Sequence, residues 1–478
     1  MQYISYDFLY FTAASVLLYY ITPKKYRKYA LLLSNIVFYL FSGLPNTAYL
    51  VGFTAVTYGA ALLSDICGNK AKKAVFTLYI LLSAGSLVFV KFANYALGGF
   101  SKLTGSSLIT LDLIYPLGIA FFTLQGISYV ADVYRGKYTA DRNVINVAVF
   151  MTYFPLIVQG PISRYDRLSK ELAEGHRFDS KKFSFGLQLL LWGLFKKLVI
   201  ANRAAAFADE VFNNYTEYSG MVIVTGALVY SLQLYADFSG CVDICRGVSG
   251  LFGVTLGQNF NFPYSAVSIK DFWARWHISL SSWLKDYIYI PLGGNRRGKV
   301  RKYLNIIIVF LVSGLWHGVG LHYIVWGLYH GALQVAGDLL KPAKNYITDK
   351  LGVEKERFSY KFGRQILTFV MVAYGWLLFR ANGLRAALSM TRSMFVKFFC
   401  IDQWNALFDT EDFRVLVLFV LVFAAVSILQ KRYSLREKLA KQNLWFRCAV
   451  SLTALFTVII FGVYGSGYNA SDFLYMQF

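Results

Sequence analysis

The chain has 478 residues, of which 56% are hydrophobic and 15% are charged, and its formal net charge is +22. An ordinary soluble enzyme of this length does not need so large an apolar share. The Lys and Arg residues lie in short loops between apolar runs, which argues against nucleic-acid binding and for orientation in a membrane. The five cysteines contain no CxxC pair, so they indicate neither a disulfide framework nor a zinc site.

Apolar runs follow one another along the whole chain. They lie near residues 5–22, 29–42, 47–63, 74–95, 111–134, 143–160, 183–208, 219–236, 303–319, 321–340, 365–381, 413–429 and 445–467. Most are long enough for a helix to cross a hydrocarbon core of about 30 Å. They predict an all-α polytopic membrane protein with about 11–12 transmembrane helices, plus re-entrant and interfacial helices. Since the polar loops are short, residues 1–478 are expected to form a single membrane domain.

The loops between these runs differ in charge. Basic loops lie at 23–28, 68–73, 135–142, 161–182, 285–302, 341–364 and 430–444, and acidic or neutral loops at 43–46, 96–110, 209–218 and 399–412. Because basic loops are retained in the cytoplasm, both termini are predicted to be extracytoplasmic. The run 143–160 lies between two basic loops and contains Pro155. We interpret it as re-entrant, a conformation that needs protein or a cavity around its backbone.

Residues 237–302 form the longest predicted cytoplasmic stretch. Near 271–286, apolar and polar faces alternate at about 100° per residue, which predicts an amphipathic interfacial helix of about 16 residues. Its apolar face carries Trp273, Trp276, Leu280 and Leu284, and His277 lies at the edge of that face. Asp237 and Asp243 open the stretch, where helix capping is the expected role.

His317 stands at the end of an apolar run, in the string SGLWHG (313–318). If run 303–319 rises from the cytoplasm and 321–340 returns, the glycine-rich tip between them is tight and His317 lies near it. A titratable group at membrane depth is a functional candidate, and an imidazole suits the role of general base. The alternatives are a hydrogen bond that joins two helices, or a metal site with His322 and His330, which irregular spacing disfavours.

Lys196 and Lys197 interrupt the apolar run 183–208, although a lysine cannot face lipid at low cost. Two interpretations stay open. The lysines line the path of an anionic cofactor, or they mark a helix break at the interface. Arg296 and Arg297, in the basic loop 285–302, are weaker candidates for binding the same cofactor.

Four long strings lie in or near a motif-bearing core at about 111–340. They are FPLIVQGPISRYDRL (154–168), YADFSGCVDI (235–244), FWARWHISLSSWLKDYIYIPLGGNRRG (272–298) and SGLWHG (313–318). Together they resemble the membrane-bound O-acyltransferases, and among these the bacterial group of the alginate O-acetyltransferase membrane subunit and the teichoic-acid D-alanyl transferase. The C-terminal spans, 365–467, carry no such motif beyond about residue 382.

The resemblance implies a funnel-shaped fold with a thin central partition. It places the family's invariant histidine at His317, as general base. Its second polar position, histidine or asparagine, falls on His277, which would support the acyl group; an interfacial aromatic-belt residue is the alternative there. The implied acyl donor is a cytoplasmic thioester, acetyl-coenzyme A or an acyl-carrier protein, with no metal. An extracytoplasmic acyl-accepting or esterase-like partner protein is also implied.

We interpret the chain as an O-acyltransferase of the bacterial cytoplasmic membrane that moves a short acyl group, chiefly acetyl, to a cell-surface polysaccharide. His277 and His317 are then expected on opposite sides of the partition. D-Alanyl transfer to lipoteichoic acid is the alternative within the family. A secondary transporter or a polysaccharide export channel would also explain polar residues at membrane depth, but no inverted repeat is visible.

The charge pattern predicts that Arg297 is cytoplasmic and Asn213 extracytoplasmic. Single cysteines at these positions, in a background without the five native cysteines, can be probed in intact cells with an impermeant thiol reagent. We expect labelling at position 213 alone, because the basic loop stays inside. Position 297 should react only after lysis, and its labelling in intact cells would overturn the orientation.

Overall fold

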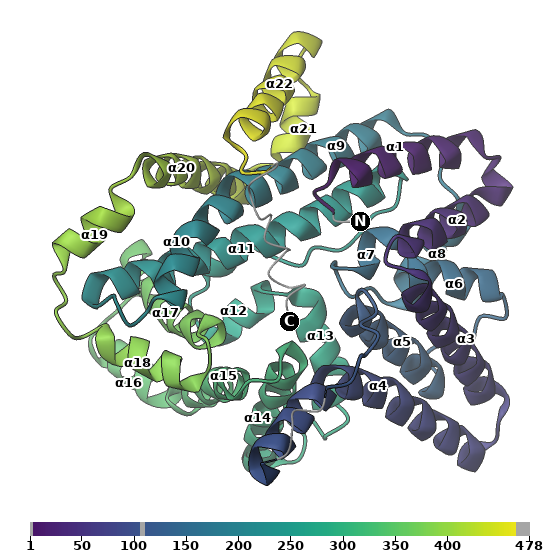
Figure 1. Ribbon diagram of the computed structural model, residues 1–478, viewed down its shortest axis with the longest axis horizontal. Helices are drawn as coiled ribbons and strands as arrows, with labels where there is room; N and C mark the ends of the chain where they lie inside the picture. Colours follow the sequence, from purple (N-terminus) through teal and green to yellow (C-terminus); the bar gives the residue numbers. More distant parts are fainter. Residues whose placement is uncertain (1–2, 106–109, 465–478) are drawn as a thin grey trace. The chain divides into compact units, whose positions relative to one another are not determined.

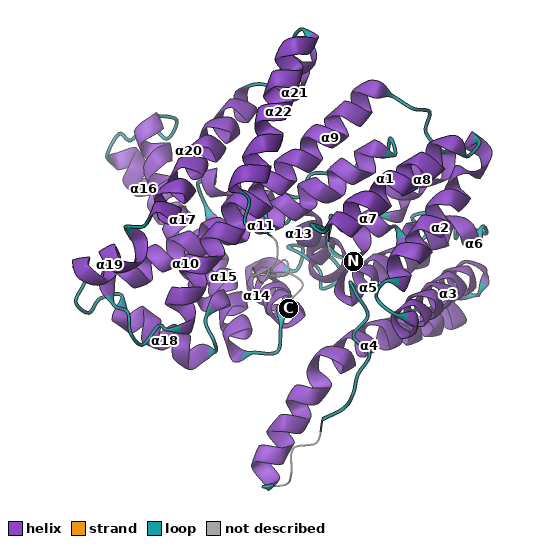
Figure 2. Cartoon of the chain, turned by 45° about the horizontal axis from the view of Figure 1, so that its top comes forward, coloured by secondary structure: helices purple, strands orange, loops and turns teal. Residues whose placement is uncertain are grey.

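The computed structural model describes residues 3–105 and 110–464. Within these residues every regular element is a helix and no strand occurs, which confirms the all-α prediction (Figure 1, Figure 2). In this part of the chain, eight helical runs are long and apolar enough to cross a membrane: Leu44–Ile66, Asn69–Thr104, Ser180–Asn213, Gly220–Leu251, Gly298–His317, Phe358–Arg380, Glu411–Arg432 and Leu444–Phe461. The chain is therefore a multi-pass membrane protein. The number 11–12 stays a prediction, because shorter helices of 14–16 residues cover some of the other runs.

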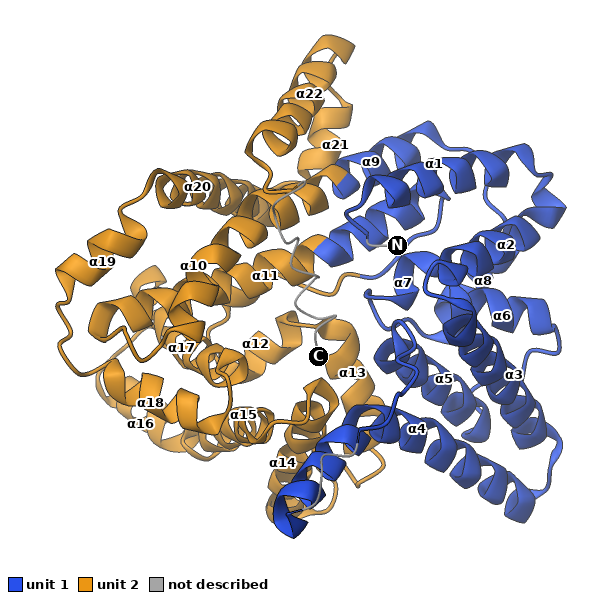
Figure 3. Cartoon of the chain, in the orientation of Figure 1, with its two compact units in different colours: residues 1–190, 241–257 blue, residues 191–240, 258–478 orange. Residues whose placement is uncertain are grey.

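The helices group into two compact units (Figure 3). Unit 1 contains residues 1–190 and 241–257, and unit 2 contains residues 191–240 and 258–478. The chain passes from one unit to the other three times, twice inside the long helical runs Ser180–Asn213 and Gly220–Leu251 and once between residues 257 and 258. The expectation of a single membrane domain stays a prediction.

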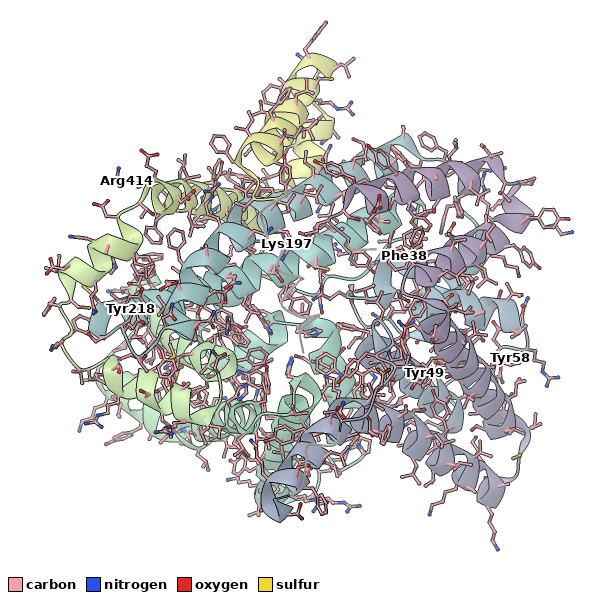
Figure 4. The ribbon with its side chains drawn as sticks, in the orientation of Figure 1. Phe38, Tyr49, Tyr58, Lys197, Tyr218 and Arg414 are labelled. Atoms are coloured by element: carbon pink, nitrogen blue, oxygen red, sulfur yellow. The ribbon has the colours of Figure 1, made fainter. Side chains whose placement is uncertain are left out.

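Unit 1 has an aromatic packing centre. It consists of α1 (Tyr6–Ile21), η1 (Lys24–Tyr26), α2 (Arg27–Leu40), α3 (Leu44–Ile66), α4 (Asn69–Thr104), α5 (Ile119–Tyr134), α6 (Val144–Thr152), α7 (Phe154–Ile157), α8 (Tyr165–Glu174), most of α9 (Ser180–Leu194) and the end of α11 (Gly220–Leu251). The ring of Phe38, labelled in Figure 4, is at the centre of this group. Its centroid lies 5.6–6.1 Å from those of Tyr3, Phe8 and Phe154. Such rings supply much of the buried apolar area of a small core.

The segment 143–160 is not a continuous span. It forms α6 and α7, which hold nine and four residues, so neither can cross a bilayer. Asn35 of α2 fills the break between them. Its amide nitrogen donates to Thr152 Oγ1 (3.2 Å), and its side-chain oxygen accepts the Phe154 N–H (3.0 Å). The irregular backbone is thus enclosed by protein, as the re-entrant interpretation requires.

Unit 2 carries the remaining helices. It consists of the end of α9, η2 (Phe195–Ala201), α10 (Asn202–Asn213), α11 as far as Gly240, η3 (Pro263–Ser265), α12 (Ile269–Arg275), α13 (Ile278–Leu284), η4 (Lys285–Tyr289), α14 (Gly298–His317), α15 (Leu321–Leu339), α16 (Lys341–Lys350), α17 (Phe358–Arg380), α18 (Leu384–Ser393), α19 (Ile401–Phe408), α20 (Glu411–Arg432), α21 (Leu435–Ala440) and α22 (Leu444–Phe461). The long helices α14, α15 and α17 pack together. They form the frame of the histidine-bearing region.

Helix α11 is longer than the hydropathy pattern predicts. The apolar run ends at 236, but the helix has 32 residues and continues to Leu251. Asp237 and Asp243 therefore lie inside the helix, and the predicted capping role was wrong. Asp237 forms an ion pair with a lysine, and Asp243 forms one with Arg246. Pairing lowers the cost of a carboxylate in an apolar helix, so the helix continues where hydropathy indicates an end.

The predicted single amphipathic helix at 271–286 was wrong as one element. The structure has two short helices, α12 and α13, followed by the π-helical segment η4. Between the helices, Trp276 is extended, and His277 adopts left-handed backbone angles with φ 45° and ψ 53°. Each of the two short helices keeps an apolar face. The helical periodicity of the sequence therefore continues across the break, and the sequence pattern does not indicate that the helix is interrupted.

Helices α14 and α15 form the predicted hairpin, with Gly318–Gly320 at its tip. Two glycines let the helices approach closely. A Cβ at Gly314 would lie 2.3 Å from the Tyr323 carbonyl oxygen, and one at Gly327 would lie 2.4 Å from the Phe310 carbonyl oxygen. No larger residue fits at either place without moving a helix, which is the packing that small residues permit in membrane bundles.

The close approach predicts that Gly327→Ala destabilises the hairpin. The added methyl group must push α14 away, and overpacking of this kind costs about 1–3 kcal/mol. The matched control is Gly337→Ala on the same helix, where an added Cβ meets nothing within 4 Å. Thermal unfolding of the purified proteins should show a lower melting temperature for the first variant only. Equal melting temperatures would contradict the packing described here.

Candidate active site

His317 is the last residue of α14, and only 5% of its surface is exposed. The ring centroids of Trp326 and Phe379 both lie 5.1 Å from its own, and both rings stand nearly perpendicular to the imidazole. Trp316, from the same helix, lies 5.0 Å away. The hairpin tip therefore holds a buried imidazole among aromatic rings, at the place that the sequence predicts.

His277 is also buried, with 1% exposure, and lies at the break between α12 and α13. Asn259, equally buried, holds this break together. Its backbone carbonyl accepts the Ile278 N–H (2.9 Å), and its side-chain oxygen accepts the Ser279 N–H (2.9 Å). These are N–H groups that the first turn of a helix leaves without helical acceptors. The Asn259 amide nitrogen lies 3.2 Å from His277 Nδ1.

Asn259 fixes the orientation of the His277 ring. Both polar atoms of its carboxamide lie against His277 Nδ1, with Nδ2 at 3.2 Å and Oδ1 at 3.4 Å. When Nδ2 donates to Nδ1, the neutral ring carries its proton on Nε2. Burial lowers the pKa of His277 to about 3, because an apolar surrounding disfavours the charged form. His277 is thus neutral at physiological pH.

The two histidines line one small cavity in unit 2. Its other lining residues are apolar or aromatic: Leu234, Trp273, Trp276, Leu280, Trp326, Trp376 and Phe379. Among the described lining residues, the imidazoles and the indole N–H groups are the only polar side-chain atoms. The expected placement of the histidines on opposite sides of a partition stays a prediction.

This arrangement combines a potential proton acceptor with a proton donor. An imidazole can take a proton from a hydroxyl group. A neutral imidazole with its proton on Nε2, the tautomer in which the Asn259 amide nitrogen donates to His277 Nδ1, can bind an oxygen atom that gains negative charge during a reaction. Because aromatic rings surround both groups, such interactions are stronger than in water.

Lys196 and Lys197 lie in the π-helical segment η2, and both are buried. Figure 4 labels Lys197. Lys197 forms an ion pair with Asp237 of α11, and Lys196 donates a hydrogen bond to Ser239 Oγ at 3.0 Å. The helical run Ser180–Asn213 continues through this point as a π-helical segment, so the structure shows a local irregularity and not the helix break that one of the two interpretations expects. Segments of π-helix are frequent at functional sites. A path for an anionic cofactor stays a prediction.

The remaining candidates from the sequence lie outside the cavity lining. Arg296 and Arg297 occupy an exposed turn before α14, and their role in donor binding stays a prediction. His322 and His330 lie on α15, where His330 is fully buried. Over residues 3–105 and 110–464, no group of three His, Cys, Asp or Glu side chains is arranged to hold a metal ion.

Two features of the site were not predicted. Asn259 stands 18 residues before its partner in irregular backbone, where no periodicity or motif singles it out. The tryptophans at 273 and 276 were assigned to the membrane interface, but they line the cavity. A usable signal was present, because four of the nine tryptophans of the chain line this cavity and two of them, Trp273 and Trp276, closely precede His277 in one string.

Comparison with known proteins places this site in a family. Residues 138–350, which include both cavity histidines, match the model of the membrane-bound O-acyltransferase family. The chain is 36% identical over 385 residues to the probable alginate O-acetylase of Pseudomonas syringae pv. tomato, across 79% of this chain and 72% of that protein. It is 34% identical over 397 residues to the peptidoglycan O-acetyltransferase of Helicobacter pylori, across 77% and 74%.

A third relative extends the comparison. The teichoic acid D-alanyltransferase of Bacillus subtilis is 29% identical over 242 residues, across 46% of this chain and 58% of that protein. Relatives with this range of acyl groups favour an enzyme over the transporter that the sequence also allows. The chain belongs to the membrane-bound O-acyltransferase family and is an O-acyltransferase of the cell membrane.

Proposed function

We propose that this enzyme transfers an acetyl group from a cytoplasmic thioester donor to hydroxyl groups of a cell-surface polysaccharide. The relatives named alginate O-acetylase and peptidoglycan O-acetyltransferase support this substrate class. The observation that carries the proposal is the pair of buried histidines lining one apolar cavity. The proposal covers surface polysaccharides as a class, because the alginate O-acetylase and the peptidoglycan O-acetyltransferase match the chain at similar identity.

The proposed reaction is a single acyl transfer. His317 accepts the proton of the attacking hydroxyl, and the oxygen forms a bond to the carbonyl carbon of the thioester. The Nε2–H of His277 binds the carbonyl oxygen as it gains negative charge. The C–S bond then breaks, and the thiolate takes the proton from His317. The products are an oxygen ester and a free thiol, so both histidines return to their starting state.

The lining of the cavity favours acetyl over D-alanyl. A D-alanyl group carries an ammonium, and burial of an unpaired charge is costly. The described lining residues include no Asp or Glu that could pair with it. Acetyl is small and uncharged, so walls of leucine, tryptophan and phenylalanine can enclose it without burying an unpaired charge. D-Alanyl transfer to teichoic acid stays the second candidate, because one relative carries that name.

We propose an acyl donor on the cytoplasmic side of the membrane and a partner protein on the outer side. Acetyl-coenzyme A or an acyl-carrier protein is anionic, which suits the basic loops 285–302 and 341–364 and the exposed Arg296 and Arg297. Lys196 and Lys197 are further candidates for the donor path. On the outer side, the attacking hydroxyl belongs either to the polysaccharide itself or to an acyl-accepting or esterase-like partner protein, which would then pass the acetyl group to the polysaccharide in a second transfer.

His317→Ala should remove O-acetylation of the surface polysaccharide while the protein still inserts at normal levels. Loss of one general base commonly costs about 10²–10⁴-fold. The matched control is His322→Ala, because His322 lies on the same hairpin but outside the cavity lining. Ester release from isolated polysaccharide, measured beside membrane levels of each variant, checks this. Normal ester content in His317→Ala would exclude the catalytic role.

The purified enzyme should cleave acetyl-coenzyme A only when an acceptor hydroxyl is supplied, on a partner protein or on a sugar. The free thiol is measured colorimetrically, and His317→Ala should release none. Cleavage that did not depend on an acceptor would contradict direct transfer. Faster use of a D-alanyl carrier than of acetyl thioesters would instead favour the second candidate.

The low pKa of His277 predicts a dependence of stability on pH. The unfolded chain binds a proton at this residue below about pH 6.5, whereas the folded protein does so only near 3. The contribution of His277 is therefore present above 6.5 and is lost as pH falls towards 3. Melting temperatures at pH 7.5 and 4.5 should differ less for His277→Asn than for the wild type. An equal difference would show that His277 is not held neutral.

A further inference from the structure

His330 is the buried histidine that the proposed reaction does not use. It lies on α15 with no measurable exposure. Its ring is enclosed by aromatic rings, with the centroids of Trp273, Trp326 and Tyr329 at 5.2–5.3 Å. Two of these residues, Trp273 and Trp326, line the cavity of His317. His330 thus stands directly behind the cavity wall.

The contact between His330 and Trp273 is a directed one. The Trp273 Nε1–H donates to His330 Nδ1 at 3.4 Å, and the two rings are perpendicular. Because an indole nitrogen can only donate, Nδ1 must be the acceptor, which places the proton of the neutral ring on Nε2. Trp273 therefore depends on His330 for the orientation of its indole, one of the apolar faces of the cavity.

Trp326 packs between His330 and His317, the proposed general base. Trp326 is fully buried, and its ring lies 5.3 Å from His330 on one side and 5.1 Å from His317 on the other. Its ring is perpendicular to that of His317. A displacement of His330 would reach the imidazole of His317 through this single tryptophan, because packed interiors transmit such shifts.

A glycine on α17 makes room for His330. A Cβ at Gly375 would lie 2.5 Å from His330 Nε2 and 3.1 Å from its Cε1. The next residue, Trp376, lines the cavity. Any side chain at 375 would therefore push the imidazole towards Trp273 and Trp326. Among the described residues, no hydrogen-bond partner faces Nε2, so the ring is held by packing on that side and by the Trp273 bond on the other.

We propose that His330 is a positioning residue that limits the acyl group to acetyl: it fixes the Trp273 wall through Nδ1 and holds Trp326 against His317. The inference rests on the proposed acetyl transfer. With the wall fixed, we expect the cavity to exclude acyl chains longer than acetyl. When the hydrogen bond between Trp273 and His330 is lost, we expect the Trp273 indole to turn away, so that propionyl or butyryl groups can enter the cavity. One methylene in an apolar pocket is worth about 10–200-fold in selectivity, so the effect is measurable.

The test uses acetyl-, propionyl- and butyryl-coenzyme A with the full-length enzyme and its acceptor. His330→Phe keeps the ring but removes the acceptor atom, and Trp273→Phe removes the donor. Each should lower acetyl transfer roughly three- to tenfold, the value of one hydrogen bond. Each should also raise the propionyl-to-acetyl ratio of kcat/KM about tenfold. The double variant should match the single ones, because all of them break the same bond.

His330→Asn is the conservative rescue. Its side-chain oxygen can take the place of Nδ1, so it should restore the preference for acetyl. A purely structural role would make it no better than His330→Phe. Additive effects in the double variant, or the absence of rescue by asparagine, would overturn the proposal.

Gly375→Ala tests the positioning role of His330 from α17, the helix that packs against Nε2 of its ring. It should change the acyl preference by pushing His330, whereas Gly363→Ala on the same helix should leave it unchanged. An added Cβ at 363 meets nothing within 4 Å. Equal preferences in the two variants would count against the proposal.

Failure of the proposed function looks different from failure of this inference. A wild-type enzyme that cleaves none of the thioesters would overturn acetyl transfer itself. The bond can still be measured then, as a non-additive change in the melting temperatures of the His330→Phe and Trp273→Phe variants. Additive melting temperatures would overturn the inference, and an active enzyme whose variants keep the wild-type acyl preference would overturn it alone.

Discussion

Where water is excluded, every buried backbone polar group needs a partner within the protein, and this constraint decides where the chain can interrupt its helices. Two breaks are solved in the same way. Asn35 bridges the break between α6 and α7, and Asn259 bridges the break between α12 and α13. A carboxamide suits this position because its oxygen accepts a backbone N–H that the start of a helix leaves without an acceptor, while its nitrogen contacts a neighbouring side chain, Thr152 at the first break and His277 at the second. The second break is the one that presents His277 to the cavity.

Close helix packing and bulky rings act together around the site. Glycines at 314 and 327 let α14 and α15 approach until a Cβ would overlap a carbonyl oxygen. The remaining space is filled by tryptophan and phenylalanine rings at about 5 Å from His317. A proton acceptor must be held to within about half an ångström to react efficiently. Rigid neighbours supply that precision where a flexible side chain such as leucine would not.

The parts of the fold that could be predicted are those whose cause is local in sequence. His317 and its hairpin follow from an apolar run that ends in glycines, and the break in segment 143–160 follows from Pro155. Asp237 was misassigned because its cation, Lys197, lies 40 residues earlier in the chain. Asn259 was missed for a similar reason. Hydropathy and periodicity describe single elements, whereas ion pairs and bridging amides depend on which elements meet in space.

The left-handed backbone at His277 restricts which residues can occupy this position. For most L-residues such angles cost about 1–2 kcal/mol, since Cβ crowds the following carbonyl. Histidine and asparagine are among the few side chains enriched there. The resemblance implies that these same two residues alternate at this place in the family. The backbone conformation and the chemistry of the cavity therefore both favour histidine or asparagine at position 277. An aliphatic residue there would strain the backbone and destabilise the fold even without a substrate.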